Sequence, residues 1–315
     1  MAGYWLLVVG LAGCGKYRDF ALPLQSGGPS VHWKWQAHAE PVLQRGARGD
    51  WDAVDVLNPS VLQRGGKYFN FYSGYDGKTW HTGLATSGDG IAWHKEGQIL
   101  SSALNGSAID SSSEILYYYQ AGSPVEIGLA RGIDGKNWQS RGGPVLAVGP
   151  YGSWDERGVA DPYVIRMGGV LYMFYLGMDR ARRQRLGVAE SNDGVSWYKL
   201  RSNPILELGE YGAFDANGLG EPAVWVSRGY YWMLYTGRDS SEVRRLGLAR
   251  SRDGVRWEKL AIVIAGDQPW DSKVICDPTV ITNGEQVTVW FGGGDVARPD
   301  QNLDGQVGLA TLVPQ

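Results

Sequence analysis

Residues 154–197 read WDERGVADPYVIRMGGVLYMFYLGMDRARRQRLGVAESNDGVSW, and residues 214–257 read FDANGLGEPAVWVSRGYYWMLYTGRDSSEVRRLGLARSRDGVRW. Both stretches carry the same features in the same places. These are an aromatic-Asp pair, an acid followed by Pro, a Gly that closes an aromatic run, a Gly-[Val/Leu]-Ala triplet, and Asp-Gly shortly before Trp. Partial copies recur along the chain, at a period of about 40 to 60 residues that indicates a repeat architecture.

The clearest repeated element is Gly-[Leu/Val]-Ala, with a Trp ten residues after the Gly and an Asp-Gly pair between them. Four copies start at Gly83, Gly128, Gly187 and Gly247, and a fifth triplet starts at Gly308. Because Gly accepts positive φ and Asp bonds its own backbone, each Asp-Gly pair predicts a tight turn between two strands; these pairs begin at Asp89, Asp134, Asp193 and Asp253.

Each repeat reads as four short antiparallel strands, which is typical of one blade of a β-propeller. We therefore predict an all-β, five-bladed β-propeller over residues 31–315, with a solenoid as the alternative. The last repeat stops after its third strand, while the segment around Trp35 resembles an isolated fourth strand. The N-terminal strand is therefore expected to complete the last blade and close the ring, which leaves no open seam.

A second repeated position lies just before the first strand of each repeat, usually before Pro. It is occupied in chain order by Asn58, Asn105, Asp161, Glu221 and Asp277, where Asn105 requires one inserted residue in the alignment. In a propeller the innermost strands surround one axis, so we expect these five side chains to meet in a central funnel. Turn preference alone explains Asn and Asp here. It explains Glu221 poorly, and three gathered carboxylates would raise the pKa of at least one of them, as general acid catalysis requires.

Composition narrows the classes of function. The 315 residues include 46 Gly, 14 Trp and 17 Tyr and carry a net charge of −3, which indicates a folded chain without the basic field that draws proteins to nucleic acid. Two cysteines, Cys14 and Cys276, cannot build a disulfide framework or a cysteine zinc site. The histidines at positions 32, 38 and 94 fall outside the predicted funnel, so no metal site is predicted.

The N-terminus reads as a targeting segment. Residues 4–13 form an apolar run too short to span a bilayer, which needs about 20 residues. Leu11-Ala12-Gly13-Cys14 resembles the lipobox of bacterial lipoproteins, although no Lys or Arg precedes the apolar run. The resemblance implies a signal peptide over residues 1–14, lipidation of Cys14, and an exported protein held on a membrane, periplasmic or at the cell surface. Plain secretion and a wrongly assigned start are the alternatives, and residues 15–30 read as a polar tether.

The acid-Pro pairs, the Tyr-x-Gly-x-Asp strand ends and the Ser-x-Asp-Gly-x-x-Trp hairpins together resemble the five-bladed β-propeller glycosidases of glycoside hydrolase families 43, 32, 62 and 130. That resemblance implies cleavage of glycosidic bonds by an Asp base or nucleophile, a tuning Asp and a Glu acid. It implies Glu221 as the acid and Asp161 as the tuning carboxylate, and it places the base at Asn105. Because an amide cannot act as that base, Asp277 or Asp55 must supply the second carboxylate. We expect a glycoside hydrolase that uses Glu221 as acid and Asp161 or Asp277 as its partner.

The resemblance leaves three functions open: a glycoside hydrolase, a phosphorylase in which rim arginines hold phosphate, and a catalytically disabled lipoprotein that binds glycans. We expect an oligo- or polysaccharide as the partner and no cofactor, although some relatives carry calcium in the channel. Trp80 and His81 are the expected carbohydrate subsite. The remaining expected substrate-binding residues are Asn58, Asn105, Asp55, Asp179, Arg180, Arg238 and Asp239.

Overall fold

The computed structural model describes residues 16–111 and 113–315, and most of its strands fall into antiparallel sets of four. The first two sets are β3 (Asp55–Arg64), β4 (Lys67–Tyr75), β5 (Trp80–Ser87) and β6 (His94–Ser101), then β7 (Leu104–Ser111), β8 (Glu114–Ala121), β9 (Glu126–Gly132) and β10 (Trp138–Ser140). The next two are β11 (Gly158–Met167), β12 (Val170–Met178), β13 (Gln184–Ser191) and β14 (Tyr198–Leu200), then β15 (Gly218–Ser227), β16 (Tyr230–Arg238), β17 (Arg244–Ser251) and β18 (Trp257–Ile264).

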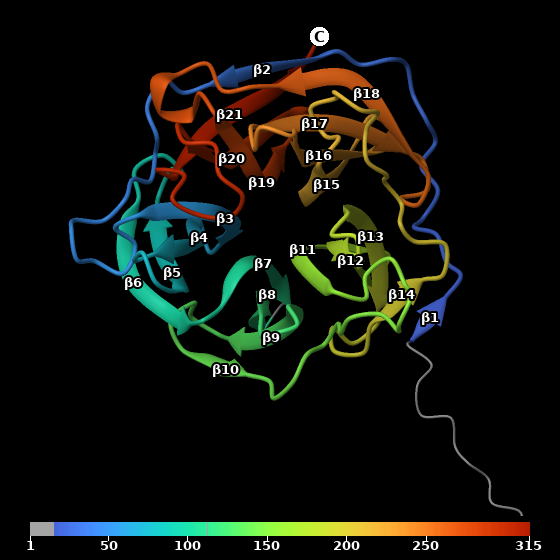
Figure 1. The fold of residues 1–315 in the computed structure, drawn as a ribbon, viewed down its shortest axis with the longest axis horizontal. Coiled ribbons are helices and arrows are strands. Elements are labelled where there is room, and N and C mark those ends of the chain that lie inside the picture. The colour runs from blue at the N-terminus through green and yellow to red at the C-terminus, as the bar shows by residue number, and fades with distance from the viewer. Residues whose placement is uncertain (1–15, 112) are drawn as a thin grey trace, which may run out of the picture.

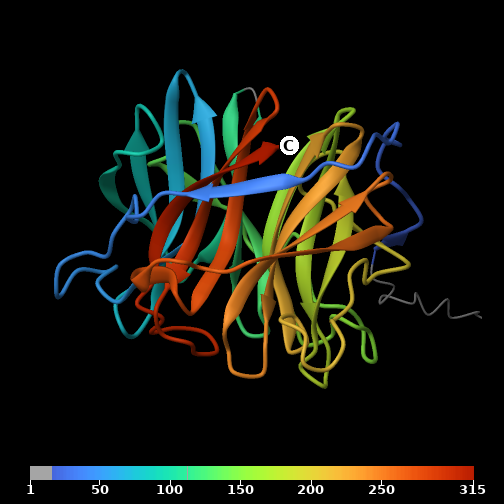
Figure 2. The same ribbon diagram turned by 90° about the horizontal axis from the view of Figure 1, so that it is seen from above.

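The last set combines the two ends of the chain. It contains β19 (Val274–Asn283), β20 (Gln286–Gly294), β21 (Gln306–Pro314) and the early strand β2 (Trp33–Ala37), and the short 3-10 turn η1 (Pro269–Asp271) precedes it. Strand β2 pairs antiparallel with β21, from Trp33 opposite Pro314 to Ala37 opposite Ala310. Figure 2 shows the blue β2 running beside the red β21. The predicted closure of the last set by the N-terminal strand is confirmed.

The sets are arranged around one axis, with β3, β7, β11, β15 and β19 innermost (Figure 1). Each of these innermost strands contacts its neighbours in that cyclic order, and β19 contacts β3. The predicted all-β propeller architecture is therefore confirmed. By hydrogen bonding there are four sheets among the described residues, because a parallel bridge between Arg244 and Val274 joins the last two sets into an eight-stranded sheet. The count of five separate blades stays a prediction from the repeats.

Repeated aromatic residues explain why Gly recurs at the end of the second strand. A Cβ atom on Gly177 would lie 2.2 Å from the ring of Trp154, and one on Gly74 would lie 2.3 Å from the ring of Trp51. The same relationship joins Gly237 to Phe214 and Gly293 to Trp270. Only Gly leaves room for these rings, so this repeated spacing serves packing.

The Asp of each aromatic-Asp pair is buried, and in three sets it is bonded to a Tyr and a Lys. Asp155 is fully buried and accepts from the hydroxyl of Tyr175 and from Nζ of Lys199. The other two groups are Asp52 with Tyr72 and Lys95, and Asp215 with Tyr235 and Lys259. A buried carboxylate requires such partners, so these aspartates belong to the framework.

The Asp-Gly pairs stand in loops longer than the tight turns predicted. Between β13 and β14, Oδ1 of Asp193 accepts the backbone N–H groups of Val195 and Ser196, and the indole of Trp197 donates to the carbonyl of Gly194. The side chain of Asp193 thus replaces the backbone contacts of a two-residue turn. The loops at Asp89, Asp134 and Asp253 repeat the same Asp contacts.

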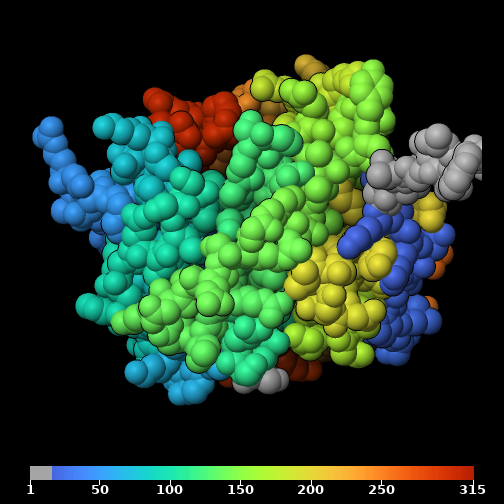
Figure 3. Space-filling view, turned by 90° about the horizontal axis from the view of Figure 1, so that it is seen from below, coloured from blue at the N-terminus to red at the C-terminus, as the bar shows by residue number. Residues whose placement is uncertain are grey.

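The segment predicted as a tether lies against the outer strands. Strand β1 (Tyr17–Arg18) pairs in parallel with β14, and the side chain of Leu22 is buried. Figure 3 shows this blue segment against the yellow surface next to β14. The predicted signal peptide and Cys14 lie outside the described residues. Across the described part of the chain, we find no helix with the length and apolar character needed to cross a membrane.

Candidate functional site

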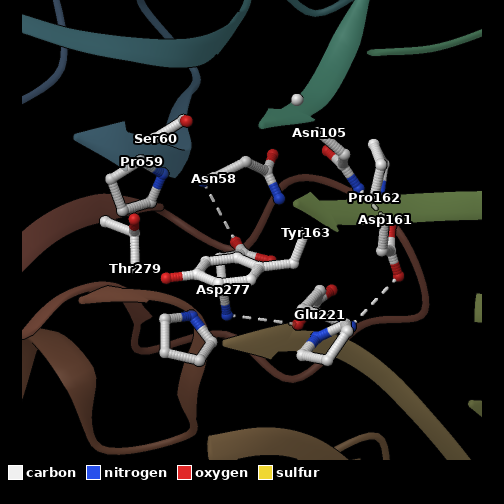
Figure 4. Close-up of a pocket in the computed structure, with 13 residues that line it drawn as sticks. Asn58, Pro59, Ser60, Asn105, Asp161, Pro162, Tyr163, Glu221, Asp277 and Thr279 are labelled. Atoms are coloured by element: carbon white, nitrogen blue, oxygen red, sulfur yellow. Dashed lines mark hydrogen bonds between the residues drawn. The ribbon is translucent and has the colours of Figure 1, made fainter. Parts of the chain in front are cut away.

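The five positions predicted to surround the axis come together in one pocket (Figure 4). We call Asn58, Asn105, Asp161, Glu221 and Asp277 the ring residues; each has a left-handed backbone, with φ between 46° and 51°. The pairing register shifts at each of them, as between Ala160 and Tyr163, so every ring residue sits in a β-bulge. Bulges re-aim side chains, and a non-Gly residue at positive φ stores strain typical of functional sites.

Backbone N–H groups link the ring residues across neighbouring sets. The N–H of Glu221 donates to Oδ2 of Asp161 at 3.3 Å, and the N–H of Asp277 donates to Oε2 of Glu221 at 3.2 Å. The N–H of Asn58 donates to Oδ2 of Asp277 at 3.2 Å. Each donor therefore finds its acceptor on the preceding set, and this holds three carboxylates in a row.

One residue on the second strand of each set decides which side chain accepts the backbone N–H of the next ring residue. Ser73 and Gln120 supply side-chain oxygens to the N–H groups of Asn105 and Asp161. The equivalent positions on β12 and β20 are Leu176 and Gly292, which have no acceptor, so Asp161 and Asp277 take that task. Because Thr236 also accepts from the N–H of Asp277, at 3.3 Å, Glu221 is the carboxylate least committed to the backbone.

Burial and mutual repulsion alter the acidity of two carboxyl groups. Burial, followed by the charge of Glu221, raises the pKa of Asp161 to about 7. The Asn105 amide donates to Oδ1 of Asp161 at 2.9 Å, which lowers this pKa and so limits the rise. Burial and the same charge raise the pKa of Asp277 well above its usual range, and a hydrogen bond with Glu221 adds to the rise. Oδ1 of Asp277 is buried without a hydrogen-bond partner among the described residues. Asp161 and Asp277 therefore retain protons near neutral pH.

A cavity of about 470 Å³ opens above the ring residues, and we call it the funnel. All of the ring residues line it, together with Trp80, Gln184, Arg238, Arg244 and Asp300. These side chains come from the inner strands and from the connections between second and third strands with the strand ends that flank them. Its lining mixes aliphatic side chains with charged and amide groups and one indole, which suits a hydroxyl-rich ligand with apolar ring faces.

Several residues expected at the substrate lie elsewhere. Asp55 is fully buried, and its carboxylate accepts the N–H groups of Asn302, Leu303 and Gly305, so it holds the β20–β21 loop. His81 packs edge-on against Trp51 and does not line the funnel.

The rim residues expected to bind substrate also make hydrogen bonds and ion pairs within the protein. Asp179 and Asp239 close the turns before β13 and β17 by accepting backbone N–H groups and Arg side chains. Arg180 bonds to Tyr151 and Glu156 outside the funnel. Of the predicted rim residues, Arg238 and Trp80 do line the funnel. Arg238 is held there by Glu242 and Gln184, and the Trp80 ring stacks on Tyr75 at 4.9 Å.

Arg244 is a site residue that the sequence motifs did not single out. It is buried in the funnel wall, where its guanidinium donates to the carbonyl groups of Arg298 and Pro299. Burial lowers the pKa of Arg244, but the nearby acidic groups of Cys276, Glu221 and Asp277 raise it overall. The charge of Arg244 in turn lowers the pKa of Asp277. Nothing in the repeat spacing distinguishes it, because its partners come from a loop without a repeat equivalent.

Within residues 16–111 and 113–315, one cluster has ligand atoms close enough to hold a metal. Glu221, Cys276 and Asp277 place theirs within 4.8 Å of one another. Calcium, which the resemblance raised, requires six to eight oxygen ligands. A buried thiol and the nearby guanidinium of Arg244 do not fit that requirement, so this cluster is not a calcium site.

The fold and the carboxylate ring define the class of protein as a β-propeller of the glycosidase type. Residues 58–276, more than two thirds of the chain, match the family model for the glycosyl hydrolases family 32 N-terminal domain, and the chain belongs to that family. The resemblance stated from the motifs is confirmed.

The similarity to individual proteins is low in sequence identity. An uncharacterized protein of Mycobacterium tuberculosis is 29% identical over 158 residues, which is 47% of this chain and 52% of the relative. A 1,2-β-oligomannan phosphorylase of Thermoanaerobacter is 27% identical over 135 residues, 40% of this chain and 44% of that enzyme. The aligned part thus spans about half of these relatives. The structure of β-1,2-mannobiose phosphorylase from Listeria innocua matches with a TM-score of 0.69 at 12% identity, covering 88% of this chain and 96% of that one. This likeness shows the fold.

Proposed function

We propose that the protein is a glycoside hydrolase that cleaves a glycan in the funnel, with Glu221 as general acid and Asp161 as its carboxylate partner. The observation that carries the proposal is the row of three carboxyl groups in one pocket, two of them with raised pKa values. Glycosidic cleavage requires one protonated and one ionised carboxyl group.

The repulsion between Asp161 and Glu221 favours one shared proton on this pair but does not assign it, so exposure and hydrogen bonding divide the roles. The charge of Glu221 raises the pKa of Asp161, so a proton on Glu221 removes that repulsion and favours the ionised form of Asp161. Glu221 is more exposed than either aspartate and less committed to the backbone, which suits contact with the leaving oxygen. Asp277 shares a hydrogen bond with Glu221 and acts as the tuning group.

The two asparagines bring amides to the ring, and Asn105 takes the place where the family resemblance implies the base. The Asn105 amide donates to Asp161, which orients that carboxylate and favours its charged form. Asn58 lines the funnel beside Asp277. Their amides supply hydrogen bonds to sugar hydroxyls without adding a further charge to the ring.

Substitution of Glu221 by Gln tests the proposal. We expect turnover of a cleavable glycoside, found by screening a glycoside panel, to fall by about 10²- to 10⁴-fold while glycan affinity persists. Asp161→Asn should have a loss of similar size, whereas Glu258→Gln, on the outer strand β18, should behave as the wild type. An active Glu221→Gln variant would contradict the assignment.

Two other functions remain candidates. Phosphorolysis is favoured by Arg238 and Arg244 in the funnel wall and by the phosphorylase among the relatives. It would make cleavage depend on inorganic phosphate and yield a sugar phosphate, which a hydrolase does not. A binding protein would retain glycans and cleave none of the panel.

We also propose export and lipid anchoring at Cys14, supported by the lipobox-like residues 11–14. Mass spectrometry of the protein from bacterial membranes should find a lipid-modified N-terminal Cys14. Cys14→Ser should abolish the modification and release the protein from the membrane fraction. An unmodified Cys14 in the wild type would refute the anchor.

A further inference from the structure

A second cavity, of about 520 Å³, lies on the rim beside the funnel. It is lined by residues of the 152–156 segment, which precedes β11, and by the connection between β12 and β13. Among the described residues it shares no lining residue with the funnel. Met178 and Gln184, which flank the β12–β13 connection, do line the funnel, so the two cavities are neighbours on one rim.

Positive groups in this rim cavity face solvent, and negative groups lie beneath them. The side chain of Arg180 is 58% exposed above Glu156, which is 8% exposed. The side chain of Arg183 is 59% exposed above Asp179, which is 7% exposed. Asp179 also binds the buried Arg185, so three guanidinium groups face two carboxylates within the lining. The exposed carboxylate of Glu207 also pairs with Arg185, so the solvent-facing positive groups are those of Arg180 and Arg183, which the buried carboxylates hold in place.

The equivalent connection between β16 and β17 shows which side-chain contacts this type of turn requires. There Asp239 binds Arg245 at 3.0 Å, as Asp179 binds Arg185 at 3.0 Å. In both turns the Asp Oδ1 atom accepts the N–H four residues later, which belongs to Val243 in one and Arg183 in the other.

The exposed arginines are absent from that second turn. Ser240 stands where Arg180 would be, and Val243 replaces Arg183, yet the backbone contacts are the same. The guanidinium groups of Arg180 and Arg183 are therefore unnecessary for folding this turn and are available for a ligand.

Tyr151 adds a flat surface at the edge of the cavity. Its side chain is 83% exposed, and the guanidinium carbon of Arg180 lies 4.1 Å from the centre of its ring. The same guanidinium donates to the Tyr151 hydroxyl at 2.8 Å, which fixes the two planes together. An exposed aromatic ring beside oriented guanidinium groups suits a sugar that carries an acidic group.

We propose that this rim cavity binds a uronic acid unit of a glycan, with its carboxylate on Arg180 and Arg183 and its ring against Tyr151. Carboxylates pair with guanidinium groups through two parallel hydrogen bonds, which gives the site both charge and direction. The inference rests on the proposed function only in that the ligand is a glycan. The rim cavity gives the protein a preference for acidic glycans, which the funnel residues do not provide.

Calorimetric titration of the full chain with digalacturonate at low salt tests the site without requiring turnover. We expect binding to weaken at least about tenfold in Arg180→Ala/Arg183→Ala and to persist in Glu221→Gln. Arg256→Ala is the matched control, because this 89% exposed arginine also pairs with an Asp in a loop, at Asp253, outside the cavity lining. Thermal melting checks that the double variant remains folded.

Three results would overturn the proposal. The first is unchanged digalacturonate binding in the double variant, and the second is equal binding of the neutral methyl ester of the same sugar. The third is equal binding of inorganic phosphate, which would show a simple anion site. Loss of turnover in Glu221→Gln with retained digalacturonate binding would support both proposals, whereas failure of the funnel chemistry alone leaves the titration result standing.

Discussion

The backbone N–H of Glu221 donates to Oδ2 of Asp161 at 3.3 Å, which joins the inner strands β15 and β11 at the axis. Leu176 stands at the second-strand position that elsewhere supplies this acceptor, so a ring carboxylate performs a structural task. The same carboxylate is buried beside the charge of Glu221. The Asp161 carboxylate therefore both holds the backbone of Glu221 and interacts with its charge.

Asp161 should make stability depend on pH. Its pKa is about 7 in the folded protein and 3.8 without perturbation, so the folded state retains the proton longer and stability falls as pH rises from about 4 to about 7. The shift of about three units corresponds to roughly 4 kcal/mol at most. Urea unfolding of Asp161→Asn should show a flatter pH profile, while Asp19→Asn, at a 79% exposed side chain, should retain the wild-type profile. The prediction fails if wild-type stability is constant across this range.

Gly177 should resist substitution. A Cβ there would lie 2.2 Å from the Trp154 ring, so Gly177→Ala is expected to destabilise the protein by about 1–3 kcal/mol in chemical unfolding. A Cβ on Gly142 would meet no atom within 4 Å, so Gly142→Ala should change stability by less than about 0.5 kcal/mol. Equal stabilities of the two variants would contradict the packing explanation.

The Lys199–Asp155 pair should contribute more to stability than its equivalent Lys259–Asp215. The Lys199 side chain is 7% exposed against 27% for Lys259, so Lys199→Met leaves a more deeply buried carboxylate without its partner. We expect a loss of about 3–5 kcal/mol for Lys199→Met and a smaller one for Lys259→Met. Adding Asp155→Asn to Lys199→Met should recover part of the loss, and an unfolding free energy lower than that of Lys199→Met would refute this account.

Asp55 should control the loop between β20 and β21. Replacement by Ala removes the acceptor of three backbone N–H groups, so hydrogen exchange of residues 302, 303 and 305 should accelerate at least about tenfold. Exchange in the Asp193 loop serves as the internal reference. Protection of the β20–β21 loop that survives Asp55→Ala would show that other contacts hold it. Because Asp300 and Gln301 of this loop line the funnel, glycan affinity should fall as well.

Repeat spacing was a reliable guide wherever one local pattern recurs. The ring residues were predicted from one repeated position, usually followed by Pro, and the structure brings them into one pocket. Trp80 and Arg238, which were expected to bind substrate, line the funnel. The pattern was misleading for Asp55 and His81, because closeness in sequence to a ring residue or to Trp80 does not specify which side of a strand faces the axis.

The sequence by itself determined the all-β architecture, the closure by the N-terminal strand and the identity of the ring residues, since each follows from short-range patterns repeated along the chain. Tertiary structure alone decided which carboxylates are tied to the backbone and which retain protons. Those properties depend on contacts between distant segments, such as Asn58 with Asp277 and Arg244 with the β20–β21 loop. Burial and electrostatic repulsion exist only once the inner strands surround a common axis.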